Sequence, residues 1–234
     1  PDDARRILSH SNYFGTMLVK MGEAHALLGG ATYSTADTVR PALQLIKTKP
    51  GKSIVSSCFI LVRERATGDN EVIAMADCAI NINPTEDELV DIALEAAECA
   101  KTFGIDPKIA FLSYSTHGSG KGEDVDKMKN AFEKARVKAP DIPMEGELQF
   151  DAAVAPRVAR SKCPDSTVAG HANTFIFPDI NAGNIGYKIA QRLGGFDAYG
   201  PILLGLNAPI NDLSRGCNAS EVYSMAIVTA ALAD

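Results

Sequence analysis

The sequence predicts an α/β protein with a mostly parallel sheet in the central part of the chain. Apolar, β-branched runs alternate with helical patterns through the middle of the chain, as in βαβ units. The two ends are instead largely helical. The composition, 46% hydrophobic and 22% charged over 234 residues, is that of a folded globular chain with a large core.

The predicted elements follow in order. Two neighbouring strands, 53–62 and 71–80, are joined by the turn-rich ATGDN. A helix follows over 85–104, because Thr85 and Glu88 have capping-box spacing and Gly104 ends the apolar face. The remaining elements are a strand at 108–115, a helix at 124–139, a short strand around Leu148, a helix at 151–162, a strand at 172–179, a Gly/Asn-rich segment at 181–195, a strand-like run at 200–206 and a last helix from about Ala219.

The domain boundaries are expected at two turn-rich segments, KTKPGKS and LGGFDAYGP. We therefore expect a central α/β domain over 51–200, inserted between residues 1–50 and 201–234, which pack together as a discontinuous domain. Such an arrangement places a cleft between domains, where ligands commonly bind. Because the chain starts at Pro1 without a Met, directly in a helical pattern, it is expected to be the C-terminal part of a longer protein.

Charge and cysteine content exclude several classes. A net charge of −6 argues against a nucleic-acid partner, so an anionic ligand must be held by a few placed cations and backbone amides. Five cysteines without CxxC spacing and four scattered histidines suggest neither a disulfide scaffold nor a metal site. We expect reduced thiols and a cytoplasmic location. No signal peptide is seen, and no apolar run is long enough to span a membrane.

Three segments are candidates for ligand binding, each with a structural alternative. STHGSGKGED (115–124) lies between a strand and a helix, where α/β sheets bind phosphate, or is only a flexible loop. GGATYSTADTVRP (29–41) places hydroxyls beside Arg40, or is a cap in which Thr35 starts one helix and Pro41 starts a second. In PDINAGNIGYK (178–188), a turn explains the Asn and Gly residues, whereas a binding role would use Asn181, Asn184, Tyr187 and Lys188.

The fourth segment, NDLSRGCNASE (211–221), is the most polar. Asn218 and Glu221 form a capping-box pattern that opens the last helix. That pattern leaves Ser214, Arg215 and Cys217 unexplained. An Arg beside a Ser at a helix N-terminus suits a developing oxyanion or a thiolate.

Together these motifs resemble a known family. DLSRGC after GLNAPIN, with FPDINAGNIGYK, ELQFDAAV, LSYSTHGSGKG, ADCAININPT and GGATYSTADTVRPALQ, closely resembles the phosphotransacetylases (phosphate acetyltransferases) over essentially the whole chain. The resemblance implies transfer of an acetyl group between acetyl phosphate and coenzyme A in a ternary complex, by direct thiolate attack. It also implies two α/β domains with mostly parallel sheets and an active-site cleft between them, a homodimer, no permanently bound cofactor, and coenzyme A as a substrate. Because the family enzyme is somewhat longer at its N-terminus, this chain is expected either to lack the first part of one domain or to be the catalytic C-terminal portion of a longer form.

The resemblance also assigns site residues. Ser214 is implied to hydrogen-bond the thiol, and Arg215 to bind acetyl phosphate and stabilise charge on the carbonyl oxygen. Cys217 lies at the substrate site and is expected to be structural, since direct attack needs no enzyme nucleophile. Acetyl phosphate is expected to draw on Ser115, Thr116 and Gly118, with Arg40, Thr35, Asn181, Tyr187 and Lys188 as further substrate-binding candidates.

The general base departs from the family pattern. The family has an Asp seven residues after the serine, where this chain has Glu221. Glu221 is therefore either the base or only a helix cap, and we expect the base. The alternative functions are a phosphate butyryltransferase-type enzyme with a larger acyl pocket, and a non-catalytic regulatory domain of the same fold.

Overall fold

The computed structural model describes residues 2–233, which divide into two compact units. The central unit runs from Ser56 to Ala198, and the terminal unit combines the chain up to Val55 with the chain from Tyr199 on. These limits lie near the expected ranges of 51–200 and of 1–50 plus 201–234.

The central unit is built on a mixed sheet. Its first two strands, β2 (Ser56–Glu64) and β3 (Asn70–Ala76), form an antiparallel hairpin in register from Cys58↔Ala76 to Glu64↔Asn70. The other pairings, β3 with β6 and β4 with both β5 and β6, are parallel. Strand order is β5-β4-β6-β3-β2-β7, in which the further strands are β4 (Ile109–Leu112), β5 (Met144–Leu148), β6 (Thr174–Ile176) and β7 (Asp197–Leu204). Only the first two residues of β7 belong to the central unit, and its residues from Tyr199 on belong to the terminal unit.

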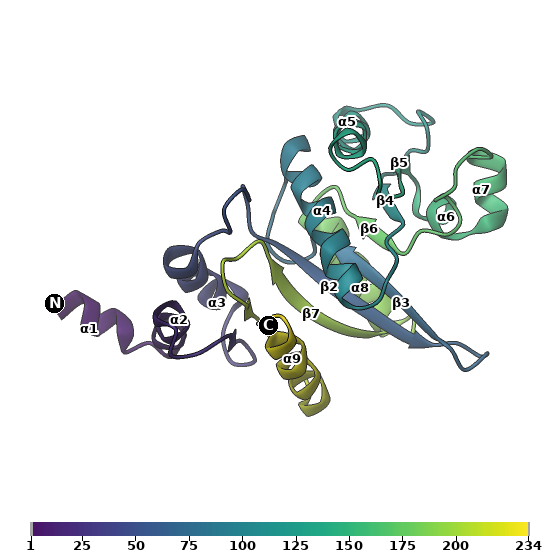
Figure 1. The fold of residues 1–234 in the computed structure, drawn as a ribbon. Helices are drawn as coiled ribbons and strands as arrows, with labels where there is room; N and C mark the ends of the chain where they lie inside the picture. Colours follow the sequence, from purple (N-terminus) through teal and green to yellow (C-terminus); the bar gives the residue numbers. More distant parts are fainter. Residues whose placement is uncertain (1, 234) are drawn as a thin grey trace. The chain divides into compact units, whose positions relative to one another are not determined.

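Helices cover both faces of this sheet. On one face α4 (Glu86–Thr102) and α5 (Glu123–Lys138) lie against the strands and against each other (Figure 1). The other face packs on the short helices α6 (Phe150–Val154) and α7 (Pro156–Lys162) and on α8 (Ile180–Arg192). Because side chains alternate along a strand, Phe111 points toward α5, where its ring meets the Phe132 ring at a tilt of 58°, while its neighbours Ala110 and Leu112 join the core on the opposite face. The single helix predicted over 151–162 is wrong, since the chain breaks at Ala155, before Pro156.

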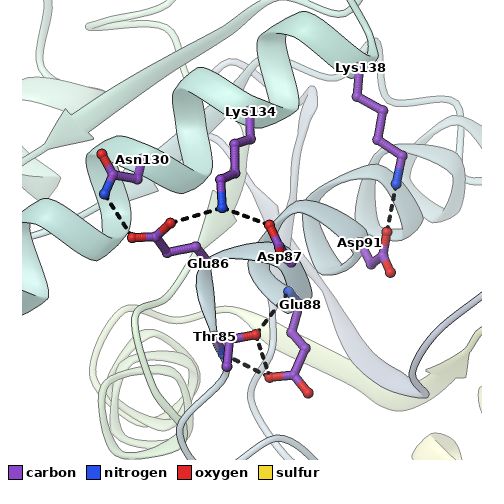
Figure 2. A network of polar contacts seen from close by, with 8 residues as sticks. All are labelled: Thr85, Glu86, Asp87, Glu88, Asp91, Asn130, Lys134 and Lys138. Atoms are coloured by element: carbon purple, nitrogen blue, oxygen red, sulfur yellow. Dashed lines mark hydrogen bonds and ion pairs between the residues drawn. The ribbon is translucent and has the colours of Figure 1, made fainter.

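Helix α4 begins as predicted. The Thr85 hydroxyl accepts the Glu88 N–H at 3.3 Å, and the Glu88 carboxylate accepts the Thr85 N–H at 2.7 Å. Ion pairs then join the exposed sides of α4 and α5 (Figure 2), each a small contribution in contact with water. They are Lys134 with Glu86 at 2.9 Å and with Asp87 at 2.7 Å, and Lys138 with Asp91 at 2.9 Å, beside a hydrogen bond from Asn130 to Glu86 at 2.7 Å.

Helix α8 corrects the predicted loop at the PDINAGNIGYK segment. The Asp179 side chain accepts the Ala182 N–H at 3.0 Å and starts the helix. Its glycines serve close packing rather than a turn: a Cβ at Gly183 would lie 2.3 Å from the Asp77 carbonyl oxygen, and one at Gly186 would lie 3.0 Å from the Phe177 ring.

The terminal unit is mostly helical with one small parallel sheet. That sheet pairs β1 (Leu27–Leu28) with β8 (Ile210–Asn211). The helices are α1 (Asp2–Leu8), α2 (Ser11–Met21), α3 (Thr35–Pro41), the π-helical turn η1 (Ala42–Ile46) and α9 (Ala219–Ala231). Buried Asn211 of β8 links β7 and α9, since its amide oxygen accepts the N–H of Leu203 on β7 and its amide nitrogen donates to Thr229 on α9, both at 2.9 Å. Within residues 2–233 no helix is both long and apolar enough to cross a membrane.

Candidate active site

Two of the predicted site segments lie side by side in the terminal unit. The parallel pairing of β1 and β8 continues beyond both strands: Gly29 N–H donates to Asn211 at 2.9 Å, Leu213 N–H to Gly29 at 3.0 Å, and Ala31 N–H to Leu213 at 3.0 Å. The backbone therefore holds the loop after β1 against the loop after β8. This brings the GGATYSTADTVRP segment to the SRG turn.

Gly30 makes this close approach possible. Its φ is +91°, and a Cβ there would lie 2.3 Å from both the nitrogen and the oxygen of Leu213. Backbone cannot move away as a flexible side chain can. A glycine is therefore required at this position by contact as well as by conformation.

The SRG turn presents its polar side chains to solvent. Ser214 and Arg215 are exposed, and Cys217 is half-buried. Gly216 N–H donates to the Ser214 hydroxyl at 3.3 Å, and Cys217 N–H donates to the Ser214 carbonyl at 3.0 Å. Both bonds stay within the turn, so the serine and arginine side chains remain available to a ligand.

Glu221 is part of a complete capping box at the start of α9. Asn218 N–H donates to the Glu221 carboxylate, and Glu221 N–H donates to the Asn218 side chain, both at 2.9 Å. The predicted cap is confirmed. The base remains a prediction, and the geometry requires the same carboxylate to cap the helix and, if it is the base, to accept a proton.

Helix α3 begins one residue earlier than predicted. Its N-cap is Ser34, whose hydroxyl accepts the Asp37 N–H at 3.3 Å, so Thr35 is the first helical residue rather than the cap. Hydrogen bonds from Ser34 are the main cause that lowers the pKa of Asp37, and the charges of Arg40 and Arg215 lower it further. Thr35 is half-buried and Arg40 is exposed. These residues share the terminal unit with Ser214 and Arg215.

In the central unit, the glycine loop after β4 is occupied by a carboxylate of the protein itself. Glu147, 1% exposed at the end of β5, accepts the Ser115 hydroxyl at 2.8 Å and the Gly118 N–H at 2.7 Å. Ser115 is fully buried and also accepts the Gly120 N–H at 2.9 Å. Thr116 is 5% exposed and donates to Gln149 at 3.1 Å. The donors predicted to hold a phosphate thus have partners inside the protein.

Glu147 carries its negative charge at neutral pH. Burial raises the pKa of Glu147, but the Gly118 N–H, its own backbone N–H, the Ser115 hydroxyl and the His117 charge outweigh it, so the pKa lies below its ordinary value. A carboxylate fixed there repels a second anion. Sequence reasoning missed Glu147; the available signal was an acidic residue next to Leu148 in a strand otherwise read as buried.

The predicted site residues on α8 differ in burial. Tyr187 is 7% exposed, and its ring stacks on Phe59 with centroids 4.0 Å apart. Lys188 is exposed and donates to Asn184 at 2.8 Å, and Asn181 is exposed in the first turn. The Tyr187 ring belongs to the core, whereas Lys188 and Asn181 lie at the surface.

The central unit also holds a cavity of about 1150 Å³ that contains none of the predicted site residues. Its walls come from the hairpin, β6, the chain around α6, and α8. They are rich in aromatic rings, contributed by Tyr114, Phe150, Phe175, Phe177 and Phe196.

Four of the cysteines are buried: Cys58, Cys78, Cys99 and Cys163. Interaction with Cys99 and burial hold the pKa of Cys58 well above its ordinary value, and burial does the same for Cys78. Burial also raises the pKa of Cys163. In residues 2–233 no three His, Cys, Asp or Glu side chains gather in a way that could hold a metal ion.

The comparisons with known proteins agree with these motifs. The profile of the family described as Phosphate acetyl/butaryl transferase matches residues 1–230, so the chain belongs to that family of acyltransferases. It is 55% identical to the phosphate acetyltransferase of Bacillus subtilis (strain 168) over 232 residues, which is 99% of this chain and 70% of that protein.

Two solved structures have the same fold. A phosphotransacetylase from Streptococcus pyogenes superposes with a TM-score of 0.94 at 60% identity, covering 99% of this chain and 70% of that one. A phosphotransacetylase from Staphylococcus aureus superposes with a TM-score of 0.88 at 51% identity, covering 100% of this chain and 70% of that one. The predicted family and α/β fold class are confirmed.

Proposed function

We propose that the chain is a phosphate acetyltransferase, which catalyses acetyl phosphate + coenzyme A ⇌ acetyl-coenzyme A + phosphate. The observation that carries the proposal is the exposed Ser214–Arg215 pair, held by backbone hydrogen bonds beside the loop that leads into α3. A hydroxyl and a guanidinium placed together serve a reaction that joins a thiol to a phosphorylated carbonyl group.

The chemistry follows from the thiol. A thiol with a pKa of about 8.5 is only a few per cent ionised at pH 7, so it needs a base or a stabilised thiolate. Ser214 hydrogen-bonds the sulfur of coenzyme A, and Glu221 accepts its proton. The thiolate then attacks the acetyl carbonyl carbon, and Arg215 stabilises the charge that develops on the carbonyl oxygen.

The reaction closes without an acetyl-enzyme. The new C–S bond forms, the C–O bond to the phosphoryl group breaks, and the leaving phosphate takes the proton that Glu221 received from the thiol. No enzyme nucleophile takes part, which leaves Cys217 a structural neighbour of the site. Coenzyme A is a substrate in this scheme, and no permanently bound cofactor is needed.

The candidate substrate-binding residues differ in exposure, and their proposed roles differ accordingly. Thr35 and Arg40 share the terminal unit with the SRG turn and contact acetyl phosphate. Asn181 and Lys188 are exposed on α8 of the central unit and stay substrate-binding candidates. The buried candidates have roles within that unit: Ser115 and Gly118 bind Glu147, Thr116 binds Gln149, and the Tyr187 ring packs on Phe59.

We propose a homodimer in the cytoplasm. Ile185, Ile189 and Leu193 of the α8 segment are 57%, 54% and 84% exposed and recur every four residues, which places them on one side of the helix. An apolar stripe of this kind is typical of an interface. Ile189→Glu is expected to yield monomers in light scattering after gel filtration, whereas Val137→Glu, at an exposed apolar position on α5, leaves the dimer intact.

The direct test is acetyl-coenzyme A formation from acetyl phosphate and coenzyme A. We expect turnover by the wild-type chain, and a loss of about 10²-fold or more in Arg215→Ala with an unchanged circular-dichroism spectrum. Arg215→Lys keeps the charge without the planar fork and is expected to fall between them. Absence of turnover in the wild-type chain refutes the proposal. Equal or faster turnover of butyryl phosphate refutes the choice of acetyl.

A further inference from the structure

One carboxyl group beside the SRG turn, that of Asp212, has no part in the proposed acetyl transfer. Asp212 is 1% exposed, and within residues 2–233 neither of its oxygens makes a hydrogen bond of ordinary geometry. Thr38 is fully buried, and its hydroxyl also lacks a hydrogen-bond partner within residues 2–233. Two unsatisfied polar groups in one buried place are costly for folding. Their position therefore calls for a functional reason.

The surroundings of Asp212 connect the two loops of the site. Its carboxyl oxygen lies against Gly30, where a Cβ would approach to 2.7 Å. Burial raises the pKa of Asp212, while the nearby Thr38 and Thr35 hydroxyls, the Leu213 N–H and the Arg215 charge act in the opposite direction. Asp212 thus interacts with the first turn of α3 and with the arginine of the SRG turn.

We propose that Asp212 is a positioning residue: its buried carboxyl group, set between Thr35 and Thr38 of α3 and the guanidinium of Arg215, fixes the SRG turn relative to the start of α3. This inference rests on the proposed function, in which Thr35 and Arg215 contact the same substrate. Asp212 does not touch substrate. It acts through Arg215, which it attracts, and through the backbone of Leu213, the residue that follows it.

The arrangement also explains why the unsatisfied groups are kept. A fully hydrogen-bonded Asp212 would hold the turn rigidly, and an apolar residue would remove one of two carboxylates, the other being Asp37, whose charge attracts Arg215. Displacements on the scale of an ångström at a reacting centre can lower rates about a hundredfold. A carboxyl group that biases Arg215 without closing a rigid ion pair keeps the guanidinium near its working position.

The test compares Asp212→Asn, which keeps the shape and removes the charge, with Thr38→Val, which removes only the hydroxyl. Asp2→Asn, at an exposed carboxylate of α1, is the matched control. We expect Asp212→Asn to lower kcat tenfold or more, with KM for coenzyme A changed by less than about threefold. Combined with Thr38→Val, its effect on kcat is expected to be non-additive.

Amide hydrogen exchange gives a readout that does not depend on activity. In Asp212→Asn, exchange is expected to rise at Ala31 and Leu213 and to stay unchanged in the central unit and in Asp2→Asn. A variant with normal kcat and normal exchange overturns the proposal, and so does one that loses only thermal stability. If the wild-type chain forms no acetyl-coenzyme A, the proposed function fails, and the exchange comparison alone then decides the role of Asp212.

Discussion

Replacing Glu221 by Gln separates the two tasks that the structure assigns to one side chain. Glu221 caps α9 by accepting the Asn218 N–H at 2.9 Å, and in the proposed reaction it also accepts the thiol proton. The Gln carbonyl oxygen can accept the same N–H, since Gln is also found at this position of capping boxes. The Gln side chain is a far weaker base, so only the second task is lost.

The two effects differ greatly in size. Losing a cap altogether costs about 1 kcal/mol, but Gln keeps the hydrogen bond and loses only the interaction of its charge with the helix N-terminus, about 0.5 kcal/mol. That corresponds to a fall in Tm of no more than about 3 °C. Removing a general base lowers turnover by about 10² to 10⁴. Activity should therefore collapse in a chain that is almost as stable as the wild type.

The assay follows thioester formation alongside thermal unfolding. Glu88→Gln is the matched control, because Glu88 closes the equivalent capping box on α4 and is not a predicted site residue. It should cost similar stability and leave turnover unchanged. Glu221→Asp restores the family residue and should retain or raise turnover. If Glu221→Gln keeps more than about a tenth of the wild-type turnover, the residue is a cap and the base lies elsewhere.

Three further outcomes follow from the contacts described. Gly30→Ala should cost more than about 2 kcal/mol of unfolding free energy, because its Cβ meets the Leu213 backbone, whereas Gly22→Ala, at φ +77° in open space, should cost about 1 kcal/mol; urea unfolding measures both. Cys217→Ala should keep turnover within about threefold in the same thioester assay, since direct attack needs no enzyme thiol, and loss of turnover would point to a covalent intermediate. The lowered pKa of Glu147 stabilises the folded state at pH values above the unfolded-state pKa of about 4.3, and this stabilisation is lost as the pH falls through the folded-state pKa. Between pH 5 and pH 3, Glu147→Gln should therefore lose less unfolding free energy than the wild type, as measured by urea unfolding at each pH.

The features that could be predicted from the sequence are those set by residues close together in the chain. The α4 start was predictable because Thr85 and Glu88 satisfy one another within a single turn, and Asn218 with Glu221 repeats that pattern. The strands β2, β3, β4 and β6 were predictable from apolar runs of strand length. Such features depend on residues a few positions apart.

The sequence was least informative where distant contacts decide the structure. Gly183 reads locally as a turn residue, yet it is helical because α8 must approach the Asp77 carbonyl. The glycine loop reads as a phosphate site, yet Glu147, from the next strand, occupies its donors. Asp212 looked like one polar residue among many, and only its burial makes it a candidate for function.

The distribution of the cysteines allows a fluorescent label to be attached at one position of the natural sequence. Since the other cysteines are buried and three of them hold raised pKa values, a polar alkylating reagent should react first with half-buried Cys217. A fluorophore attached there would sit two residues from Arg215 without any cysteine being removed or added. Binding of acetyl phosphate or inorganic phosphate could then be followed by emission in the unmodified sequence, before any acyl transfer takes place.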